Sequence, residues 1–313
     1  MHLAFIGGTR FIGQAAARRA LEVGHAVSVL HRGEHASDVA GARDVLVERR
    51  DPSALCRELA RLAPDAIVDT RAMTRADAQV TALGARILGV PAVVLSSMDV
   101  YAQFGRLNGL PAPEPEAVVT ESSPLTVPYP FRGVATDLPP EYDKKDVEEE
   151  LERAVGEGVP GVLVLRLPGV YGQGDYRRRF GPLVDRLDAG ERVLPCSGGA
   201  AWRLAHAHVR DVAHAIVSGA EQWKAGFRVL NVAERETPSM RERAEALAAE
   251  MGVALEWTEA ETVPEDLAFL GRMPNDLVVS SAALRERLGF AELTTPEERV
   301  RDLVAWLRVS RRT

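Results

Sequence analysis

The stretch that most constrains the fold lies near the N-terminus, where residues His2 to Gly13 read HLAFIGGTRFIG. Residues 3–6 form a short apolar run, two glycines follow, and an alanine-rich segment extends to Ala20. This order predicts a strand, a tight glycine turn and a helix. Gly7 permits the turn, and the small Gly13 lets the helix pack close to the strand. Free N–H groups at the helix start favour an anion, so we predict the first unit of a dinucleotide-binding fold.

The rest of the chain continues this alternation of strands and helices. We predict strands at 26–30, 45–47, 66–68, 90–95, 161–167 and 227–232. We predict helices at 15–23, 52–62, 76–88 and 238–251, and one that opens near Pro139. Such a period is typical of an α/β protein with a Rossmann-type doubly wound parallel sheet. We expect residues 1–170, joined by 206–232, to form the dinucleotide-binding domain, and residues 171–205 and 233–313 to form a smaller C-terminal substrate lobe.

Composition narrows the classes of partner. The 313 residues carry 38 basic and 45 acidic side chains, a net charge of −7, which makes nucleic-acid binding unlikely. The two cysteines, Cys56 and Cys196, have no metal-ligand spacing, so we expect no metal site and reduced thiols. No apolar run approaches the roughly 20 residues that span a bilayer. We expect a cytoplasmic protein without a signal peptide or membrane contact, and the sequence leaves a homodimer open.

Four segments resemble those of one enzyme family. The run GGTRFIG is similar to the GGTxFIG signature of the NAD-dependent epimerase/dehydratase branch of extended and atypical short-chain dehydrogenase/reductase proteins. Ser96–Tyr101 (SSMDVY), Pro168–Asp175 (PGVYGQGD, with Arg166 before it) and His208–Ala213 (HVRDVA) resemble further segments of that family. The resemblance covers nearly the whole chain and implies two C-terminal helices, at 278–289 and 296–307. It implies an NAD(P) cofactor and hydride transfer on a small, sugar-like substrate.

The same resemblance, together with the rule that ligands bind at the carboxyl ends of parallel strands, predicts the cofactor residues. They lie in the glycine turn, after the second to fifth strands, at the start of the helix near Pro139 and after the strand at 161–167. They are Gly7, Thr9, Arg10, Phe11, Ile12, Gly13, His31, Arg32, Glu48, Thr70, Arg71, Ala72, Ser96, Lys144, Pro168 and Val170.

Two arginines bear on which cofactor is preferred. An acidic residue at the end of the second strand normally binds the ribose 2′-OH of NAD, but this chain has His31 and Arg32 there. Arg32 can pair with a 2′-phosphate through charge-assisted hydrogen bonds. Arg10 follows the neighbouring first strand, so both side chains can converge on one ribose. We predict a preference for NADP over NAD; the alternative is two solvated surface arginines.

The candidate catalytic residues depart from the spacing that the family shows. By resemblance, Ser97 polarises the substrate oxygen and Tyr142 is the general acid/base. Family members place a lysine four residues after the tyrosine, but here that position is Asp146. Helix geometry favours Lys145, three residues after Tyr142. The family register instead favours Lys144, which precedes a glutamate by four residues, and then the tyrosine position falls on a proline.

Four residues are weaker candidates for substrate contact: Tyr101, Tyr171, Arg178 and Arg203. The stretch 104–138 is long, rich in proline and glycine, and is typical of a lid or substrate-contacting loop. His206 and His208 are interpreted as structural. Two functions therefore stay open: an oxidoreductase or epimerase, and a non-catalytic NADP-binding redox sensor or scaffold protein.

Overall fold

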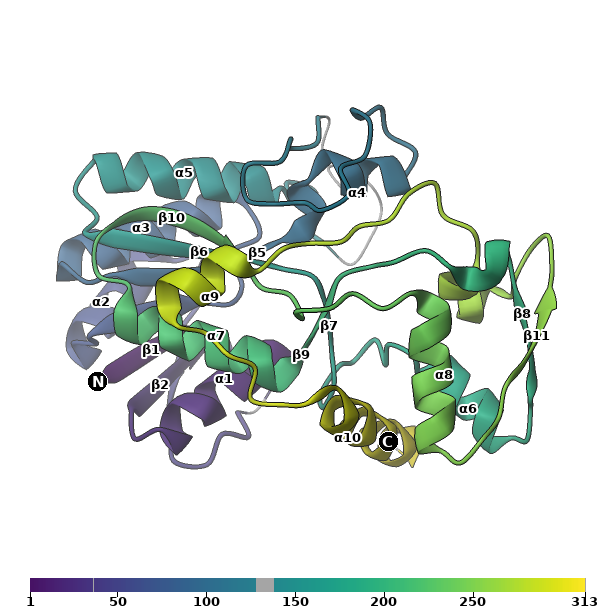
Figure 1. Cartoon of the computed structure of the whole chain (residues 1–313). Helices are drawn as coiled ribbons and strands as arrows, with labels where there is room; N and C mark the ends of the chain where they lie inside the picture. The colour runs from purple at the N-terminus through teal and green to yellow at the C-terminus, as the bar shows by residue number, and fades with distance from the viewer. Residues whose placement is uncertain (36, 128–137, 313) are drawn as a thin grey trace.

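A seven-stranded parallel sheet in the order β10-β6-β5-β4-β1-β2-β3 forms the larger part of the molecule (Figure 1). The computed structural model describes residues 1–35, 37–127 and 138–312. The strands of this sheet are β1 (His2–Ile6), β2 (Ala26–His31), β3 (Arg43–Leu46), β4 (Ala66–Asp69), β5 (Ala92–Ser97), β6 (Gly161–Leu167) and β10 (Gly226–Asn231). The α/β class and the doubly wound parallel sheet are thereby confirmed.

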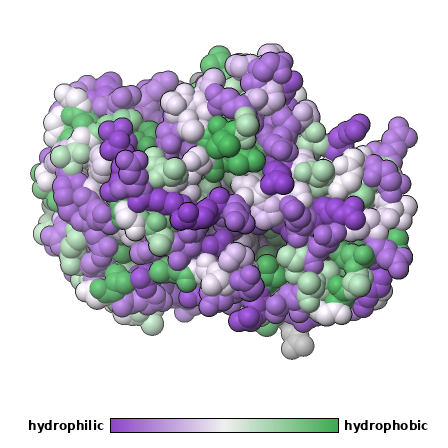
Figure 2. All heavy atoms as spheres, in the orientation of Figure 1, coloured by the Kyte–Doolittle hydropathy of each residue, from purple (hydrophilic) through white to green (hydrophobic). Residues whose placement is uncertain are grey.

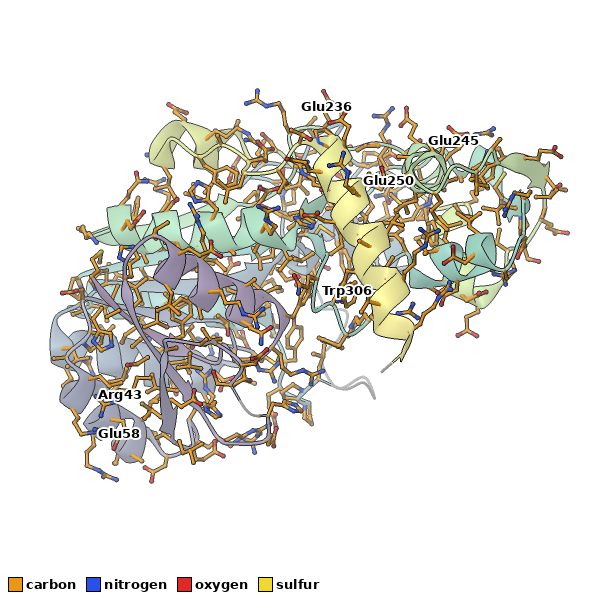
Figure 3. The ribbon with its side chains drawn as sticks, turned by 90° about the horizontal axis from the view of Figure 1, so that it is seen from below. Arg43, Glu58, Glu236, Glu245, Glu250 and Trp306 are labelled. Atoms are coloured by element: carbon orange, nitrogen blue, oxygen red, sulfur yellow. The ribbon has the colours of Figure 1, made fainter. Side chains whose placement is uncertain are left out.

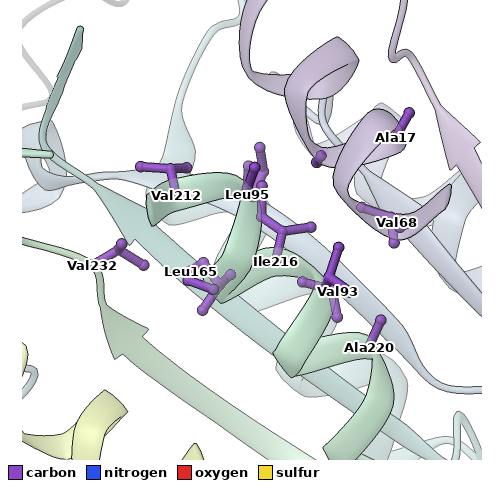
Figure 4. Packing of buried hydrophobic residues seen from close by; sticks show 14 of the residues in the cluster. Ala17, Val68, Val93, Leu95, Leu165, Val212, Ile216, Ala220 and Val232 are labelled. Atoms are coloured by element: carbon purple, nitrogen blue, oxygen red, sulfur yellow. The ribbon is translucent and has the colours of Figure 1, made fainter. Parts of the chain in front are cut away.

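Two layers of helices cover this sheet. One face carries α1 (Phe11–Glu22), α7 (Val209–Gln222) and α9 (Ala282–Leu288), and the other carries α2 (Pro52–Leu62), α3 (Arg75–Leu88) and α5 (Lys144–Gly156). Figure 4 shows the first layer from close by, with Val212, Ile216 and Ala220 of α7 packed over Val93 and Leu165 of the sheet. Both faces of the central strands are apolar because helices bury both of them.

A smaller part follows β6 and has its own apolar core. Its members include Leu183, Leu247, Leu303 and Leu307, all nearly fully buried. The elements outside the large sheet are α4 (Ala102–Leu107), β7 (Gly169–Tyr171), α6 (Gly181–Asp188), β8 (Val193–Cys196), β9 (His206–His208), α8 (Met240–Glu250), β11 (Glu256–Glu259) and α10 (Pro296–Val309). The pairs β11-β8 and β7-β9 form two further parallel sheets.

The last helix connects the two parts. Seen from below, α10 crosses between the sheet-bearing part and the smaller part, with Trp306 near its C-terminal end (Figure 3). Arg299 of α10 forms an ion pair with Asp211 of α7 at 3.2 Å, and Asp302 forms another with Arg210 at 3.1 Å. The same helix contributes Leu303 and Leu307 to the core of the smaller part. It therefore ties the start of α7 to the packing of α6 and α8.

Some predicted boundaries are wrong, and the largest error has a local cause. The helix expected near Pro139 begins at Lys144, because the Asp143 side chain accepts hydrogen bonds from the backbone N–H groups of Lys145 and Asp146. Pro139 lies in a turn instead, where its carbonyl accepts from Tyr142 N at 2.9 Å. The helix expected at 278–289 is shorter, and β3 and β5 are displaced by two residues at their starts.

The surface agrees with the charged composition. Figure 2 shows one face of the molecule, mostly hydrophilic, with hydrophobic atoms in scattered patches. Within residues 1–35, 37–127 and 138–312, no helix has the length and apolar character needed to cross a membrane.

Candidate functional site

The glycine turn after β1 is as tightly built as its sequence indicates. Gly7 has a φ of +89°, and a side chain there would collide with Oγ1 of Thr70. A Cβ on Gly13 would lie 2.7 Å from the Cα of Gly8, so the first turn of α1 touches the turn itself. The N-cap residue Arg10 makes no capping hydrogen bond through its side chain. The first N–H groups of α1 thus remain directed to the edge of the sheet where the strands end.

Residues after β4 and after β6 surround this turn. Thr70 Oγ1 donates to the Ile6 carbonyl at 3.2 Å, and the stem of the exposed Arg71 packs against Gly7. From the other side, a Cβ on Gly174 would lie 3.4 Å from the Cα of Phe11. The segment that begins at Pro168 therefore passes beside the glycine turn. These positions bring together segments far apart in the sequence, as a dinucleotide site requires.

The two arginines predicted to select the cofactor, Arg10 after β1 and Arg32 after β2, both have partners in the segment that follows β2. Arg10 Nη1 is 3.0 Å from His35 Nε2, and its guanidinium lies 5.0 Å from the centroid of the Tyr176 ring. Arg32 forms an exposed ion pair with Glu34 at 2.6 Å. Arg10 thus reaches the segment that contains Arg32. The sequence reasoning missed Glu34, whose carboxylate offsets part of the positive charge.

Lys144 is the buried cation at the start of α5. Its Nζ donates to the carbonyls of Ala72 at 2.5 Å and Leu95 at 2.9 Å, just after β4 and within β5. Burial lowers the pKa of Lys144 to about 8. Lys145 is directed elsewhere, because its Nζ donates to the Thr126 carbonyl. Of the two lysines, Lys144 is the one that lies beside the strand ends.

Tyr142 lies before the helix rather than in its first turn, so the expected helical face shared with Lys145 does not exist. Its side chain is buried, and its hydroxyl donates to Oδ2 of Asp99 at 3.1 Å. Lys144 Nζ is 5.9 Å from the centroid of the Tyr142 ring. Ser97, the last residue of β5, accepts from Asp99 N at 3.3 Å. Ser97, Asp99, Tyr142 and Lys144 therefore gather at one edge of the sheet.

Asp99 was not among the predicted site residues. The available signal was its position in SSMDVY, two residues after Ser97 and beyond a strand of a parallel sheet. It was overlooked because the resemblance draws attention to the serines and the tyrosine of that segment. It is 6% exposed, so it belongs to the interior of the site rather than to the surface.

Two predicted site residues are engaged in a buried polar network instead. Ser96 Oγ donates to Glu148 Oε1 at 2.5 Å, and Glu148 accepts from Arg166 Nε at 2.9 Å and Nη2 at 2.6 Å. Arg166 also donates to the hydroxyl of Tyr101, which donates to Asn231 at 2.7 Å. Tyr101 is fully buried and has no surface for a substrate in this conformation. The network fixes α5 to β5 and β6.

The other predicted substrate contacts are held by protein groups. Tyr171 is buried and donates to Glu234 at 2.6 Å. Arg178 binds Asp185 through both terminal nitrogens at 3.1 Å and also reaches α10. Arg203 donates to the Thr237 carbonyl at 3.1 Å while remaining exposed. Of these, Arg203 is exposed, Arg178 is half-buried and Tyr171 is buried.

A cavity of about 350 Å³ lies in the smaller part, after β8. Its lining includes the indole of Trp202, the cationic Arg272 and the polar Asn275 and Asp276. Asp276 accepts from the backbone N of Arg203 at 2.8 Å, which places Arg203 next to this lining. Among the residues that the structure describes, no three His, Cys, Asp or Glu side chains gather as a metal site needs.

Comparison with known proteins gives consistent results. Residues 4–128 match the NAD dependent epimerase/dehydratase family. The 2′-dehydrokanamycin reductase of Streptomyces kanamyceticus is 29% identical over 320 residues, covering 96% of this chain and 83% of that protein.

Solved structures share the fold over the whole length. The UDP-glucose 4-epimerase of Thermotoga maritima, solved with UDP-glucose, superposes with a TM-score of 0.74 at 17% identity, covering 99% of each chain. The UDP-glucose-4-epimerase of Stenotrophomonas maltophila, with bound NAD and formylated UDP-arabinopyranose, gives a TM-score of 0.76 at 17% identity, covering 100% of this chain and 99% of that one.

Proposed function

Because the chain belongs to the NAD-dependent epimerase/dehydratase family, we propose that it is an NADP(H)-dependent oxidoreductase that reduces a carbonyl group on a sugar-like small molecule. The observation that carries the proposal is the pairing of Tyr142 with Lys144 beside the ends of β4 and β5. A protonated phenol and a nearby ammonium are the groups that a carbonyl needs when it is reduced. The relative that acts as a reductase favours this reaction over epimerisation.

The cofactor residues follow from the glycine turn. The N-terminus of α1 would bind the pyrophosphate, with Arg71 contributing a positive charge from above Gly7. Lys144 would bind the nicotinamide ribose, and Pro168 and Val170 would flank the nicotinamide. Arg10 and Arg32 would receive the 2′-phosphate. When bound, NADPH supplies the hydride.

The chain's own residues then orient the substrate and deliver the proton. Ser97 donates a hydrogen bond to the carbonyl oxygen and fixes its direction. Tyr142 gives its hydroxyl proton to the oxygen as negative charge develops there. The ammonium of Lys144 stabilises the phenolate that Tyr142 leaves. The buried network of Ser96, Glu148 and Arg166 keeps α5, and hence Lys144, in place.

We assign the rest of the substrate to the part formed by residues 171–205 and 233–313. The 350 Å³ cavity offers an aromatic face, a cation and polar side chains, which suits a hydroxylated ring or a substituent linked to one. Arg203 and Arg272 could bind a phosphate of a nucleotide-linked sugar. The structures solved with UDP-sugars support this class of ligand.

The test is a search for turnover followed by one substitution. NADPH oxidation is measured with a panel of keto-sugars, keto-aminocyclitol glycosides and nucleotide-linked keto-sugars. With an identified substrate, Tyr142→Phe should lower kcat on the order of 100-fold or more, because the proton donor is lost. NADPH affinity and the melting temperature should change little. Unchanged kcat in this variant contradicts the mechanism, and tight NADPH binding without turnover of any compound favours the redox sensor or scaffold.

A further inference from the structure

Asp99 touches the predicted acid more directly than any family motif indicates. It lies in the short 3-10 turn Met98–Val100 that follows β5, and its side chain is buried. Its Oδ2 accepts the hydrogen bond of the Tyr142 hydroxyl at 3.1 Å. Its backbone N–H donates to Ser97 Oγ at 3.3 Å, so a hydrogen bond links the two residues directly.

Asp99 also acts on Lys144. Burial is the main cause that lowers the pKa of Lys144, and the carboxylate of Asp99 is the strongest of the charges that oppose it. Asp69 and Asp77 act in the same direction, whereas Arg71 acts in the opposite one. Asp69 lies in β4, Asp77 in α3 and Arg71 in the segment after β4. Asp99 is thus the one acid of this set that is bonded to Tyr142 and also coupled to Lys144.

We propose that Asp99 is a positioning residue that holds the Tyr142 hydroxyl in its protonated form, so that the site is set for carbonyl reduction rather than alcohol oxidation. The inference rests on the proposed function. An ionised Asp99 accepts the phenolic proton in a hydrogen bond and repels a phenolate. A reductase needs the phenol at the start of each turnover, whereas alcohol oxidation needs the phenolate as a base.

The reaction balances with these groups. The carbonyl carbon would accept a hydride, which the reduced nicotinamide of a bound NADPH would supply as it is oxidised, and the C=O π pair would move to the oxygen. That oxygen takes the proton of Tyr142, so a new O–H bond forms as the phenolic O–H bond breaks. The phenolate beside Asp99 then recovers a proton from solvent. The negative charge of Asp99 favours this last step and opposes its reverse.

The direct test measures Tyr142 without turnover. The ultraviolet absorbance of tyrosinate is titrated in the holoprotein with NADP bound, and the contribution of Tyr142 is the difference from Tyr142→Phe. Asp99→Asn keeps a hydrogen-bond acceptor but removes the charge, so Tyr142 should ionise at a pH lower by about one unit or more. Asp146→Asn is the control, because Asp146 pairs with Arg75 at the start of α3; it should leave the titration unchanged.

Activity supplies the second readout. In Asp99→Asn, the pH profiles of kcat for carbonyl reduction and for alcohol oxidation should both shift down by about one pH unit, because reduction needs the phenol of Tyr142 and oxidation needs its phenolate. An unchanged Tyr142 titration in Asp99→Asn overturns the proposal, whatever the activity. A shifted titration with no turnover of any compound supports the role of Asp99 and contradicts the proposed function instead. Asp99→Ser serves as the second variant if Asp99→Asn fails to fold.

Discussion

Arg166 and Lys144 are both buried cations at the same end of the sheet, but the protein treats them differently. Burial alone would lower the pKa of Arg166, yet the hydrogen bonds and charge of Glu148 raise it above its ordinary value. In the described part of the chain Lys144 donates hydrogen bonds only to two backbone carbonyls, and burial lowers its pKa to about 8. The positive charge of Arg166 is therefore balanced by the Glu148 carboxylate, whereas Lys144 has no carboxylate hydrogen-bonded to it among the residues that the structure describes.

The two cations, Lys144 and Arg166, both depend on the same helix, α5. Lys144 and Glu148 lie one turn apart on α5, and Glu148 is the partner of Arg166. The paired charges anchor α5 to the sheet, and this anchor places Lys144 next to Ala72 and Leu95. A buried cation with weak compensation costs folding free energy, and such groups concentrate at functional sites. We interpret Arg166 as structural and Lys144 as functional.

The largest effect should come from breaking the compensated pair. Arg166→Met leaves the Glu148 carboxylate buried with Ser96 as its remaining side-chain donor, which should cost about 3–5 kcal/mol of unfolding free energy. Chemical denaturation at pH 7 measures it. The double variant Arg166→Met/Glu148→Leu should recover most of the loss, because no charge is left unpaired. A loss below about 1 kcal/mol in the single variant would contradict a structural role for this pair.

Replacing Lys144 should stabilise the protein, whereas replacing Arg166 should destabilise it. The lowered pKa corresponds to about 3 kcal/mol of net preference against the charged form; Lys144→Met removes that cost but also takes a hydrogen-bond donor away from the carbonyls of Ala72 and Leu95. Lys144→Met should therefore raise the unfolding free energy at pH 7 by about 1–2 kcal/mol while lowering kcat. The wild type should gain stability as pH rises from about 8 toward 10.5, because the unfolded chain binds the proton more tightly there. The Lys144→Met variant should lack this rise of stability with pH. If the variant is less stable than the wild type at pH 7, the distinction between a structural Arg166 and a functional Lys144 is wrong.

The same contrast explains how far the sequence could be interpreted. The strand, glycine turn and helix around Gly7 were predictable because local sterics dictate them, and their close contacts with Thr70 and Phe11 follow from the topology. The seven-stranded sheet was predictable from the period of its apolar runs. Cofactor preference and the roles of single residues stay predictions.

The catalytic edge could not be assigned in the same way. The choice between Lys144 and Lys145 depends on where the helix begins, and that was decided by the cap at Asp143. The partners of Ser96 and Tyr101 lie far away in sequence, as does the Leu307 carbonyl that Arg178 reaches, so no local sequence pattern predicts these contacts. The period of apolar residues and the spacing of motifs do not predict which side chains pair across long distances in the sequence.

A smaller free-energy difference is expected between the binding of NADP and the binding of NAD. A charge-assisted hydrogen bond from an exposed arginine is worth roughly 1.4 kcal/mol, so NADP should bind about tenfold more tightly than NAD. Arg32→Ala should erase much of that ratio with little change for NAD. Glu34→Gln is the matched control and should increase NADP affinity, because Glu34 pairs with Arg32. Isothermal titration calorimetry with both cofactors measures these affinities. Equal affinities for NADP and NAD in the wild type would mean that Arg10 and Arg32 are solvated surface residues without a role in cofactor choice.

The central claim is that Lys144 is kept buried and charged in order to bind the cofactor. The most direct measurement is the dissociation constant of NAD, which lacks the titrating 2′-phosphate, between pH 7 and pH 9.5 for the wild type and Lys144→Met. Because the pKa of Lys144 is about 8, the wild type should bind more weakly at the upper pH, on the order of fivefold, while the variant should bind weakly with little pH dependence. The same pH dependence in both proteins would contradict the claim.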